Sequence, residues 1–188
     1  MQEINIKIRG TQPILLHKYN PEEETGGLTK EEKAIAYKTE WMKGVYLQYG
    51  VVSWPATNMM QVLFDGARGL NRGKVFFTRI LFGCLVVSPL KIPFLVDRGT
   101  VTLDKIKKED WIDITGVKIG TARVNRSRVM LPVGWELDFI IIKQSEELQD
   151  EEIKKIVVKA GKAGMGDWRP SAPKKPGPYG TFELVSFG

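Results

Sequence analysis

The C-terminal part of the chain constrains the fold most strongly, because three different elements follow one another there without interruption. Residues 150–160 carry apolar side chains on one stripe, which is typical of an amphipathic helix. A glycine-rich segment occupies residues 161–180, and residues 181–187 have the composition of a strand. The order predicts a helix, a long glycine loop and a closing strand.

The glycine loop has the residue types of a polyanion-binding segment. Gly161, Gly164 and Gly166 allow positive φ angles and a close approach of the backbone to a ligand. Side chains that grip phosphates or stack on bases are interspersed with the glycines: Trp168, Arg169, Lys174, Lys175 and Tyr179. We therefore expect ligand contact here, with a helix C-cap followed by an ordinary turn as the open alternative.

Periodicity elsewhere indicates a mixed architecture. Residues 4–9 and 135–142 alternate like strands, whereas Thr29-x-x-Glu32 has the form of a capping box that opens a helix with Ile35 and Trp41 facing inward. A further helix begins after Pro55 and ends near Ala67. We predict an α+β fold: a ferredoxin-like (RRM-like or RAMP-like) βαββαβ core with an antiparallel sheet and inserted hairpins. The whole chain, 1–188, forms one domain, with a flexible insertion around 66–75.

Composition excludes several classes of protein. No run of apolar residues is long enough for a membrane span, and residues 1–4 begin like a strand, without a signal peptide, so we expect a cytoplasmic protein with no membrane partner. Cys84 is the single cysteine and His17 the single histidine, which rules out a disulfide and a zinc site of the usual kind. No dinucleotide or P-loop motif is present, so we expect no cofactor. We also expect no metal, with metal-dependent hydrolysis through carboxylates as the open alternative.

The basic residues are unevenly distributed, although the net charge of +6 is modest. Residues 66–96, 114–135 and 168–182 contain no aspartate or glutamate, and the rest of the chain is net negative. We expect these three acid-free stretches to meet in one electropositive groove that binds a nucleic acid. The side chains expected to contact it are Arg68, Arg72, Lys74, Phe76, Arg123, Arg126, Arg128, Trp168, Arg169, Lys174, Lys175 and Tyr179.

Two of these stretches have a specific geometry. Arg126 and Arg128 are two residues apart in a basic hairpin, so they share one face of a strand and can follow successive phosphates. Arg72, Lys74 and Phe76 interleave cations with an aromatic ring, as single-strand binders do. A solvated basic surface with no ligand is the alternative for both.

His17 is the only residue that could serve as a conventional general base. It follows the first strand in the sequence Pro13-Ile14-Leu15-Leu16-His17. A second group for acid–base chemistry is not evident, so we expect a non-enzymatic protein, with a metal-independent ribonuclease that uses His17 as the alternative.

Several segments resemble known proteins. Residues 10–17, Trp54-Pro55, residues 126–128 before Trp135, and residues 160–170 leading to 179–182 resemble a family of small proteins from tailed phages, prophages and archaeal mobile elements. The leading strand and the C-terminal glycine loop also resemble the RAMP superfamily of CRISPR-associated proteins, from which the loop departs by an Asp167–Pro170 insertion. These resemblances imply a viral or mobile-element setting and a ferredoxin-like core whose glycine loop contacts RNA.

We therefore expect a sequence-tolerant single-stranded nucleic-acid binding protein of a phage or archaeal virus. It would act in replication or recombination, with single-stranded DNA favoured as its partner and with possible assembly into a homo-oligomer or filament along the strand. One alternative is a RAMP-like RNA-binding protein or endoribonuclease. Another is an anti-defence or virion protein that binds other proteins through its acidic region, residues 22–32.

Overall fold

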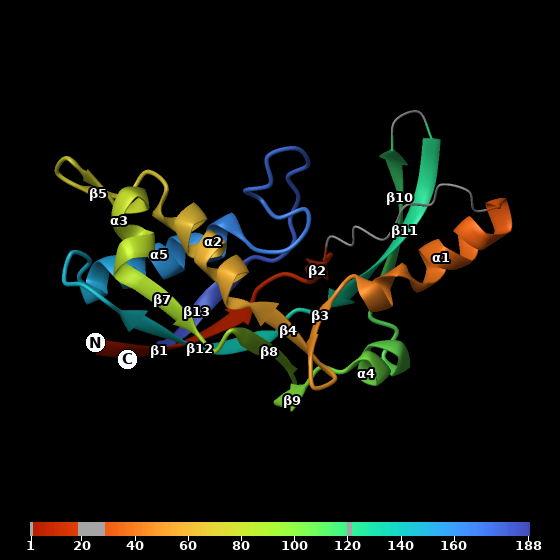
Figure 1. Cartoon of the computed structure of the whole chain (residues 1–188), viewed down its shortest axis with the longest axis horizontal. Helices are drawn as coiled ribbons and strands as arrows, with labels where there is room; N and C mark the ends of the chain where they lie inside the picture. Colours follow the sequence, from red (N-terminus) through yellow and green to blue (C-terminus); the bar gives the residue numbers. More distant parts are fainter. Residues whose placement is uncertain (1, 19–28, 120–121) are drawn as a thin grey trace.

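A computed structural model describes residues 2–18, 29–119 and 122–188; the side chains of residues 30, 33–34, 117–119 and 122–124 lie outside this description. The fold is mixed α+β, and its described strands pair antiparallel (Figure 1). The elements in chain order are β1 (Gln2–Gly10), β2 (Ile14–Leu16), α1 (Lys30–Lys43), β3 (Tyr46–Gln48), β4 (Val51–Pro55), α2 (Ala56–Ala67), β5 (Asn71–Arg72), β6 (Val75–Phe76), α3 (Phe77–Cys84), β7 (Leu85–Ser88), β8 (Lys91–Val96), β9 (Gly99–Thr100), α4 (Leu103–Lys108), β10 (Ile112–Ile119), β11 (Ala122–Leu131), β12 (Glu136–Lys143), α5 (Asp150–Ala163) and β13 (Phe182–Phe187).

β1 and β12 form the centre of the main sheet. Its strand order is β13-β1-β12-β8-β4-β3, and β7 pairs with β12 next to β8. The alternation predicted for β1 is confirmed, because Ile4, Ile6 and Ile8 are buried on one face. Ile6 lies opposite Phe139 of β12 and Ile8 opposite Leu137, so the apolar positions of the two strands share that face.

Helices α2 and α5 cover this apolar face of the main sheet (Figure 1). The two helices pack closely because Gly66 of α2 has no side chain: a Cβ there would lie 2.4 Å from the carbonyl oxygen of Ile156. Both helices were predicted from the sequence and are confirmed. A capping box between Gln149 and Glu152 begins α5, so Gln149 is the N-cap residue of this helix.

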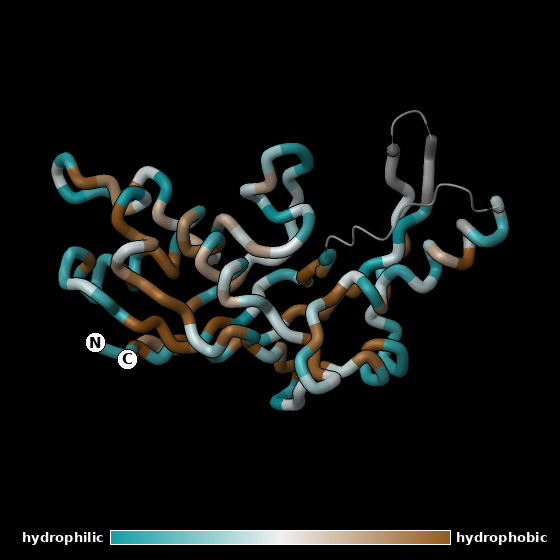
Figure 2. Tube along the Cα trace, in the orientation of Figure 1, coloured by the Kyte–Doolittle hydropathy of each residue, from teal (hydrophilic) through white to brown (hydrophobic). Residues whose placement is uncertain are grey.

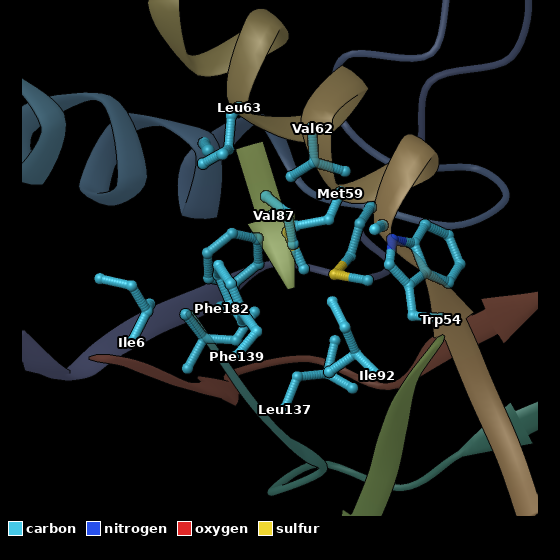
Figure 3. Packing of buried hydrophobic residues seen from close by; sticks show 14 of the residues in the cluster. Ile6, Trp54, Met59, Val62, Leu63, Val87, Ile92, Leu137, Phe139 and Phe182 are labelled. Atoms are coloured by element: carbon cyan, nitrogen blue, oxygen red, sulfur yellow. The ribbon is translucent and has the colours of Figure 1, made fainter. Parts of the chain in front are cut away.

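The core lies between the sheet and these helices. Figure 3 shows Met59, Val62 and Leu63 of α2 above Leu137 and Phe139 of β12. Figure 2 shows hydrophobic residues concentrated along the strands of the main sheet. None of the described helices is long and apolar enough to cross a membrane.

A second, smaller sheet extends from the main one. Strands β10, β11 and β2 form it, and α1 packs on β11 (Figure 1); we call β10, β11 and α1 the arm. The predicted capping box of α1 is confirmed, since Thr29 accepts a hydrogen bond from Glu32 N and the Glu32 carboxylate accepts one from Thr29 N. Trp41 is buried as expected, but Ile35 is 64% exposed, contrary to the prediction.

The region after α2 differs from its sequence pattern. Residues 75–87 are rich in β-branched and aromatic side chains, which are typical of strands, yet residues 77–84 form α3. Phe77, Leu81 and Cys84 recur at helical spacing and are buried together. The segment predicted as a flexible insertion, 66–75, contains the end of α2 and most of the short β5–β6 hairpin.

Candidate functional site

The glycine loop predicted over residues 161–180 begins later in the structure, because Gly161 lies within α5; the loop, residues 164–180, is packed against the chain's own backbone. Gly164 ends α5 with a φ of 75°, and its N–H donates to the carbonyl oxygen of Ala160. A Cβ at Gly166 would lie 2.5 Å from the carbonyl oxygen of Leu15, and Asp167 N donates to that same oxygen at 2.9 Å. These approaches hold the loop against β2; contact of Gly161, Gly164 and Gly166 with a ligand remains a prediction.

Trp168 is the central side chain of the loop. Its backbone has a φ of 51°, which is unusual for a residue with a bulky side chain. The Arg128 guanidinium lies 4.8 Å from the ring centroid of Trp168, and the Tyr179 ring centroid lies 6.2 Å away at an angle of 52°. Arg128 comes from β11 of the arm, so the loop and the arm meet at this stack.

Arg128 is buried beneath the loop. Its Nε lies 3.3 Å from Asp167 Oδ2, and its side chain is 8% exposed. Within the described part of the chain, Nη1 of this guanidinium has no hydrogen-bond partner. A buried guanidinium with a single carboxylate neighbour leaves unused donors next to the loop.

Arg169 ties the loop to α2. Its Nη2 lies 3.6 Å from Asp65 Oδ2, its Nη1 donates to the carbonyl oxygen of Gly166, and its Nε donates to Ser171 Oγ. Asp65 is 7% exposed and also lies 3.2 Å from Arg68 Nη2. One buried carboxylate is thus shared by two arginines.

A cavity of about 220 Å³ opens between the loop, the start of the arm and the main sheet, and we call it the cleft. Its lining residues come from the end of β2, the residues after α1, β4, α2 and the loop: Leu16, His17, Lys18, Gly44, Val45, Tyr46, Ser53, Trp54, Asn58, Gln61, Val62, Asp65, Met165, Gly166, Asp167 and Arg169. Lys18 and Lys91 both lie over the ring of Tyr46, at 5.4 and 4.4 Å from its centroid. The cleft therefore combines aromatic walls, hydrogen-bonding side chains and nearby cations.

The structure brings together only part of the predicted binding surface. Arg128, Trp168, Arg169 and Tyr179 lie on or beside the loop, and His17 lines the cleft. Lys174 and Lys175 lie in the exposed part of the loop and, within the described chain, pair with no carboxylate. Arg123 lies outside the residues whose side chains are described.

Four further residues of the prediction, Arg68, Arg72, Lys74 and Phe76, come from the first acid-free stretch. Arg72, Lys74 and Phe76 belong to or border the β5–β6 hairpin, at the opposite end of the long axis from the arm (Figure 1). Arg68 lies at the end of α2, with its guanidinium over the ring of Phe64. Arg72, Lys74 and Phe76 of the first acid-free stretch therefore do not join the expected groove, whereas Lys91 of the same stretch lies near the cleft.

The arginines are also neutralised by carboxylates from other parts of the chain. Arg68 and Arg169 lie near Asp65, Arg72 near Glu152, Arg126 near Glu40, and Arg128 near Asp167. An acid-free stretch of sequence does not remain acid-free in space, because tertiary packing places distant carboxylates beside it. The positive surface available to a ligand is consequently smaller than the sequence suggested.

Sequence reasoning missed the polar residues that α2 and β4 contribute to the cleft, Ser53, Asn58, Gln61 and Asp65. One signal was present: Asp65 stands three residues after the buried Val62, on the apolar stripe of α2. A carboxylate in that position needs a charged or hydrogen-bonding partner, and Arg68 and Arg169 supply it.

Groups with displaced pKa values lie away from the cleft. A hydrogen bond from Lys7 holds the pKa of Glu136 below its ordinary value, and the same bond raises the pKa of Lys7. A hydrogen bond to Glu146 raises the pKa of Lys143. Among the described residues, no three carboxylate, cysteine or histidine side chains are grouped so that they could hold a metal ion.

Comparison with known proteins finds similarity among solved structures. No protein-family model matches the chain, and no curated protein matches it. The chain is similar to a chain in the cryo-EM structure of the Type III-B Cmr-beta bound to cognate target RNA, with 11% identity and a TM-score of 0.49. The alignment covers 99% of this chain and 59% of that chain, so this chain spans less than two thirds of its neighbour's length. A likeness at this level assigns neither a family nor a function.

Proposed function

We propose that this protein binds single-stranded nucleic acid at the cleft, without cleaving it, and that RNA is preferred to DNA. The observation that carries the proposal is the cluster beside the cleft in which Arg128 of β11 lies over the ring of Trp168 and the ring of Tyr179 lies at its side. Aromatic rings backed by an arginine are the platform on which single-stranded bases stack, at about 1 to 3 kcal/mol per base. Lys174 and Lys175 supply cations for the phosphates on the same loop.

The preference for RNA rests on the polar lining of the cleft. Ser53, Asn58 and Gln61 present hydroxyl and amide groups there, beside the Asp65 carboxylate. Such groups can both donate to and accept from a 2′-hydroxyl, which is the group that distinguishes RNA from DNA. A purely electrostatic groove would lack this capacity.

We also infer a ferredoxin-like core from the order of its elements. β1, α2, β7, β12, α5 and β13 follow one another as βαββαβ, with the other elements inserted. Their strands lie in the order β13-β1-β12-β7, each neighbouring pair antiparallel, and α2 and α5 cover one face. This arrangement supports an RRM-like or RAMP-like ancestry, with the arm inserted into the core.

The test is a fluorescence-anisotropy titration with labelled single- and double-stranded RNA and DNA of one sequence. Single-stranded RNA should bind most tightly, and Trp168→Ala should weaken binding by about tenfold if one base stacks on the ring. Tyr49→Ala is the matched control, because Tyr49 is 96% exposed on the turn between β3 and β4 and does not line the cleft. Equal binding by wild type and Trp168→Ala, or no binding of any oligonucleotide, would refute the proposal.

A ribonuclease is the second candidate, because His17 lines the cleft in which the strand would lie. A histidine beside a bound ribose could move a proton during cleavage. Incubation of labelled RNA with the wild type in the presence of a chelator tests this. Cleavage that disappears in His17→Ala would replace the binding proposal with an enzymatic one, and an intact RNA after long incubation would exclude this candidate.

A further inference from the structure

The cleft has the dimensions of a site for a single base. Its volume of about 220 Å³ is below the range of about 300 to 1,000 Å³ that is typical of sites for drug-sized ligands. Tyr46 and Trp54 give it aromatic surface, and the Asp65 carboxylate gives it a hydrogen-bond acceptor. The cleft lies next to the loop that carries Trp168, since Asp167 and Arg169 line it as well.

Asp65 retains capacity to accept further hydrogen bonds. Its oxygens lie 3.2 Å from Arg68, 3.6 Å from Arg169 and 3.4 Å from Gln61 Nε2. Charge-assisted bonds from arginine to carboxylate are normally about 2.7 to 2.9 Å long, so these contacts are loose. A carboxylate offers about four acceptor positions in all. A ligand with adjacent N–H groups could therefore bind to it without displacing both arginines.

Trp54 supplies an unused donor. The residue is 9% exposed, and its indole Nε1 is buried without a hydrogen-bond partner among the described residues. Figure 3 shows the indole at the edge of the core, beside Met59. Trp54 lines the cleft, and buried N–H groups are nearly always satisfied in native proteins, so this indole N–H is a candidate donor to a ligand in the cleft.

We propose that the cleft holds one guanine base of the bound strand, and this inference rests on the proposed RNA binding. Guanine has two neighbouring donors on its Watson–Crick edge, N1–H and the N2 amino group, which a carboxylate such as Asp65 accepts together. Its O6 atom is an acceptor for a donor such as the Trp54 indole N–H. Adenine presents the unprotonated N1 instead, which a carboxylate repels. The protein would then prefer guanosine at one position of an otherwise tolerant site.

The experiment compares short uridine-only RNA with the same RNA carrying one central guanosine, inosine or adenosine. We expect the guanosine RNA to bind about tenfold more tightly than the adenosine RNA, in the range of one bidentate base contact. Inosine lacks the N2 amino group, so the affinity of the inosine RNA should lie between those of the guanosine and adenosine RNAs. Binding of all four RNAs with equal affinity would overturn the guanine site while leaving RNA binding intact, whereas binding of none would instead refute the proposed function.

Three substitutions test whether the Asp65 carboxylate causes the preference for guanosine over adenosine. Asp65→Asn should abolish the difference between guanosine and adenosine, because the amide replaces one of the two acceptor oxygens with an NH2 group, which is a donor and faces a guanine N–H group. Arg68→Ala is the matched control: it removes one ion pair of Asp65 and keeps the carboxylate, so the preference should persist. Trp54→Phe retains the ring and removes the donor, and it should reduce the preference in part. Loss of the preference in Arg68→Ala to the same extent as in Asp65→Asn would overturn the assignment.

Discussion

The Arg128 guanidinium lies 4.8 Å from the centre of the Trp168 ring, and this contact joins the arm to the glycine loop. Arg128 is contributed by β11, whereas Trp168 follows α5, so the contact joins segments that are far apart in the sequence. Asp167 also lies beside the guanidinium, with its Oδ2 atom 3.3 Å from Arg128 Nε. The orientation of Trp168 therefore depends on the arm as well as on the loop.

Arg128→Ala should destabilise the protein by about 1 to 2 kcal/mol, because it removes a partly desolvated cation–π contact and leaves Asp167 unpaired. Chemical denaturation followed by far-UV circular dichroism measures this loss. Arg79→Ala is the control: Arg79 lies 5.4 Å over Phe76, but both residues are exposed, so its effect should stay below about 0.5 kcal/mol. Equal effects of the two substitutions would contradict the structural role given to Arg128.

The salt dependence of RNA binding should be shallow. Arg68, Arg72, Arg126, Arg128 and Arg169 lie beside carboxylates, so few of the predicted phosphate contacts are free. With Lys174 and Lys175 as the main contacts, log affinity should fall with log salt concentration with a slope of about −1.4, from −0.7 per phosphate on a single strand. Anisotropy titrations over a series of salt concentrations measure the slope.

The double substitution of Lys174 and Lys175 by alanine should flatten this salt dependence almost completely. Lys107→Ala with Lys108→Ala is the matched control, because these lysines are exposed on α4 and do not line the cleft. A steep slope in the wild type that survives the substitution of Lys174 and Lys175 would show that phosphates displace the carboxylates from the paired arginines.

Local sequence patterns predicted the secondary structure well in elements whose buried residues recur at one regular spacing, that of a strand or that of a helix. The alternation of Ile4, Ile6 and Ile8 predicted β1, and the apolar stripe of α5 predicted that helix, because each element buries one face. Residues 77–84 were ambiguous, since a short apolar run fits a buried strand as well as a helix. The loop was recognised from its glycines, although these mainly approach the chain's own backbone.

The cleft was predictable only in part. His17 and Arg169 stood out because of their residue types, but the role of Asp65 is visible only once α2 is placed beside the loop. The pairing of Arg72 with Glu152 joins residues that are far apart in the chain, and no local pattern encodes it. Electrostatic surfaces depend on such pairings, and therefore charge runs alone overestimated the basic groove.

Stability should depend on pH through the contact between Lys7 and Glu136 on the main sheet. Lys7 Nζ lies 3.0 Å from Glu136 Oε2, and Glu136 also accepts a bond from Arg9 Nε. Because the pKa of Glu136 is lowered by folding, its contribution is present above the unfolded-state pKa and is lost as the pH falls through the folded-state pKa. The raised pKa of Lys7 acts in the opposite direction, and its contribution is lost only at strongly alkaline pH.

Glu136→Gln tests the part of this pH dependence that comes from the ionisation of Glu136, because glutamine does not titrate. The variant should unfold at lower denaturant concentration than the wild type at neutral pH, and the difference should vanish at acid pH, where the wild-type carboxyl is protonated. Asp138→Asn is the control, because Asp138 is half exposed and lies farther from Lys7, at 3.6 Å. A difference between Glu136→Gln and wild type that stays constant from acid to neutral pH would contradict the assignment.

Gly66→Ala tests the close packing of α2 against α5. An alanine improves helix propensity by about 1 kcal/mol, which by itself would stabilise α2. The added Cβ, however, would lie 2.4 Å from the Ile156 carbonyl oxygen and 2.7 Å from Ala160 Cβ, so the helices must move apart. Overpacking of this kind costs about 1 to 3 kcal/mol, and we expect a net loss of stability in thermal or chemical unfolding.

Gly83→Ala provides the opposite expectation at a matched position. Gly83 also lies in a helix, α3, but a Cβ there meets nothing within 4 Å. The substitution should raise stability by up to about 1 kcal/mol, since only the helix propensity changes. If Gly66→Ala stabilised the protein as much as Gly83→Ala does, α2 and α5 would not pack closely at Gly66. The layer of α2 and α5 that supports Asp65 would then need a different packing.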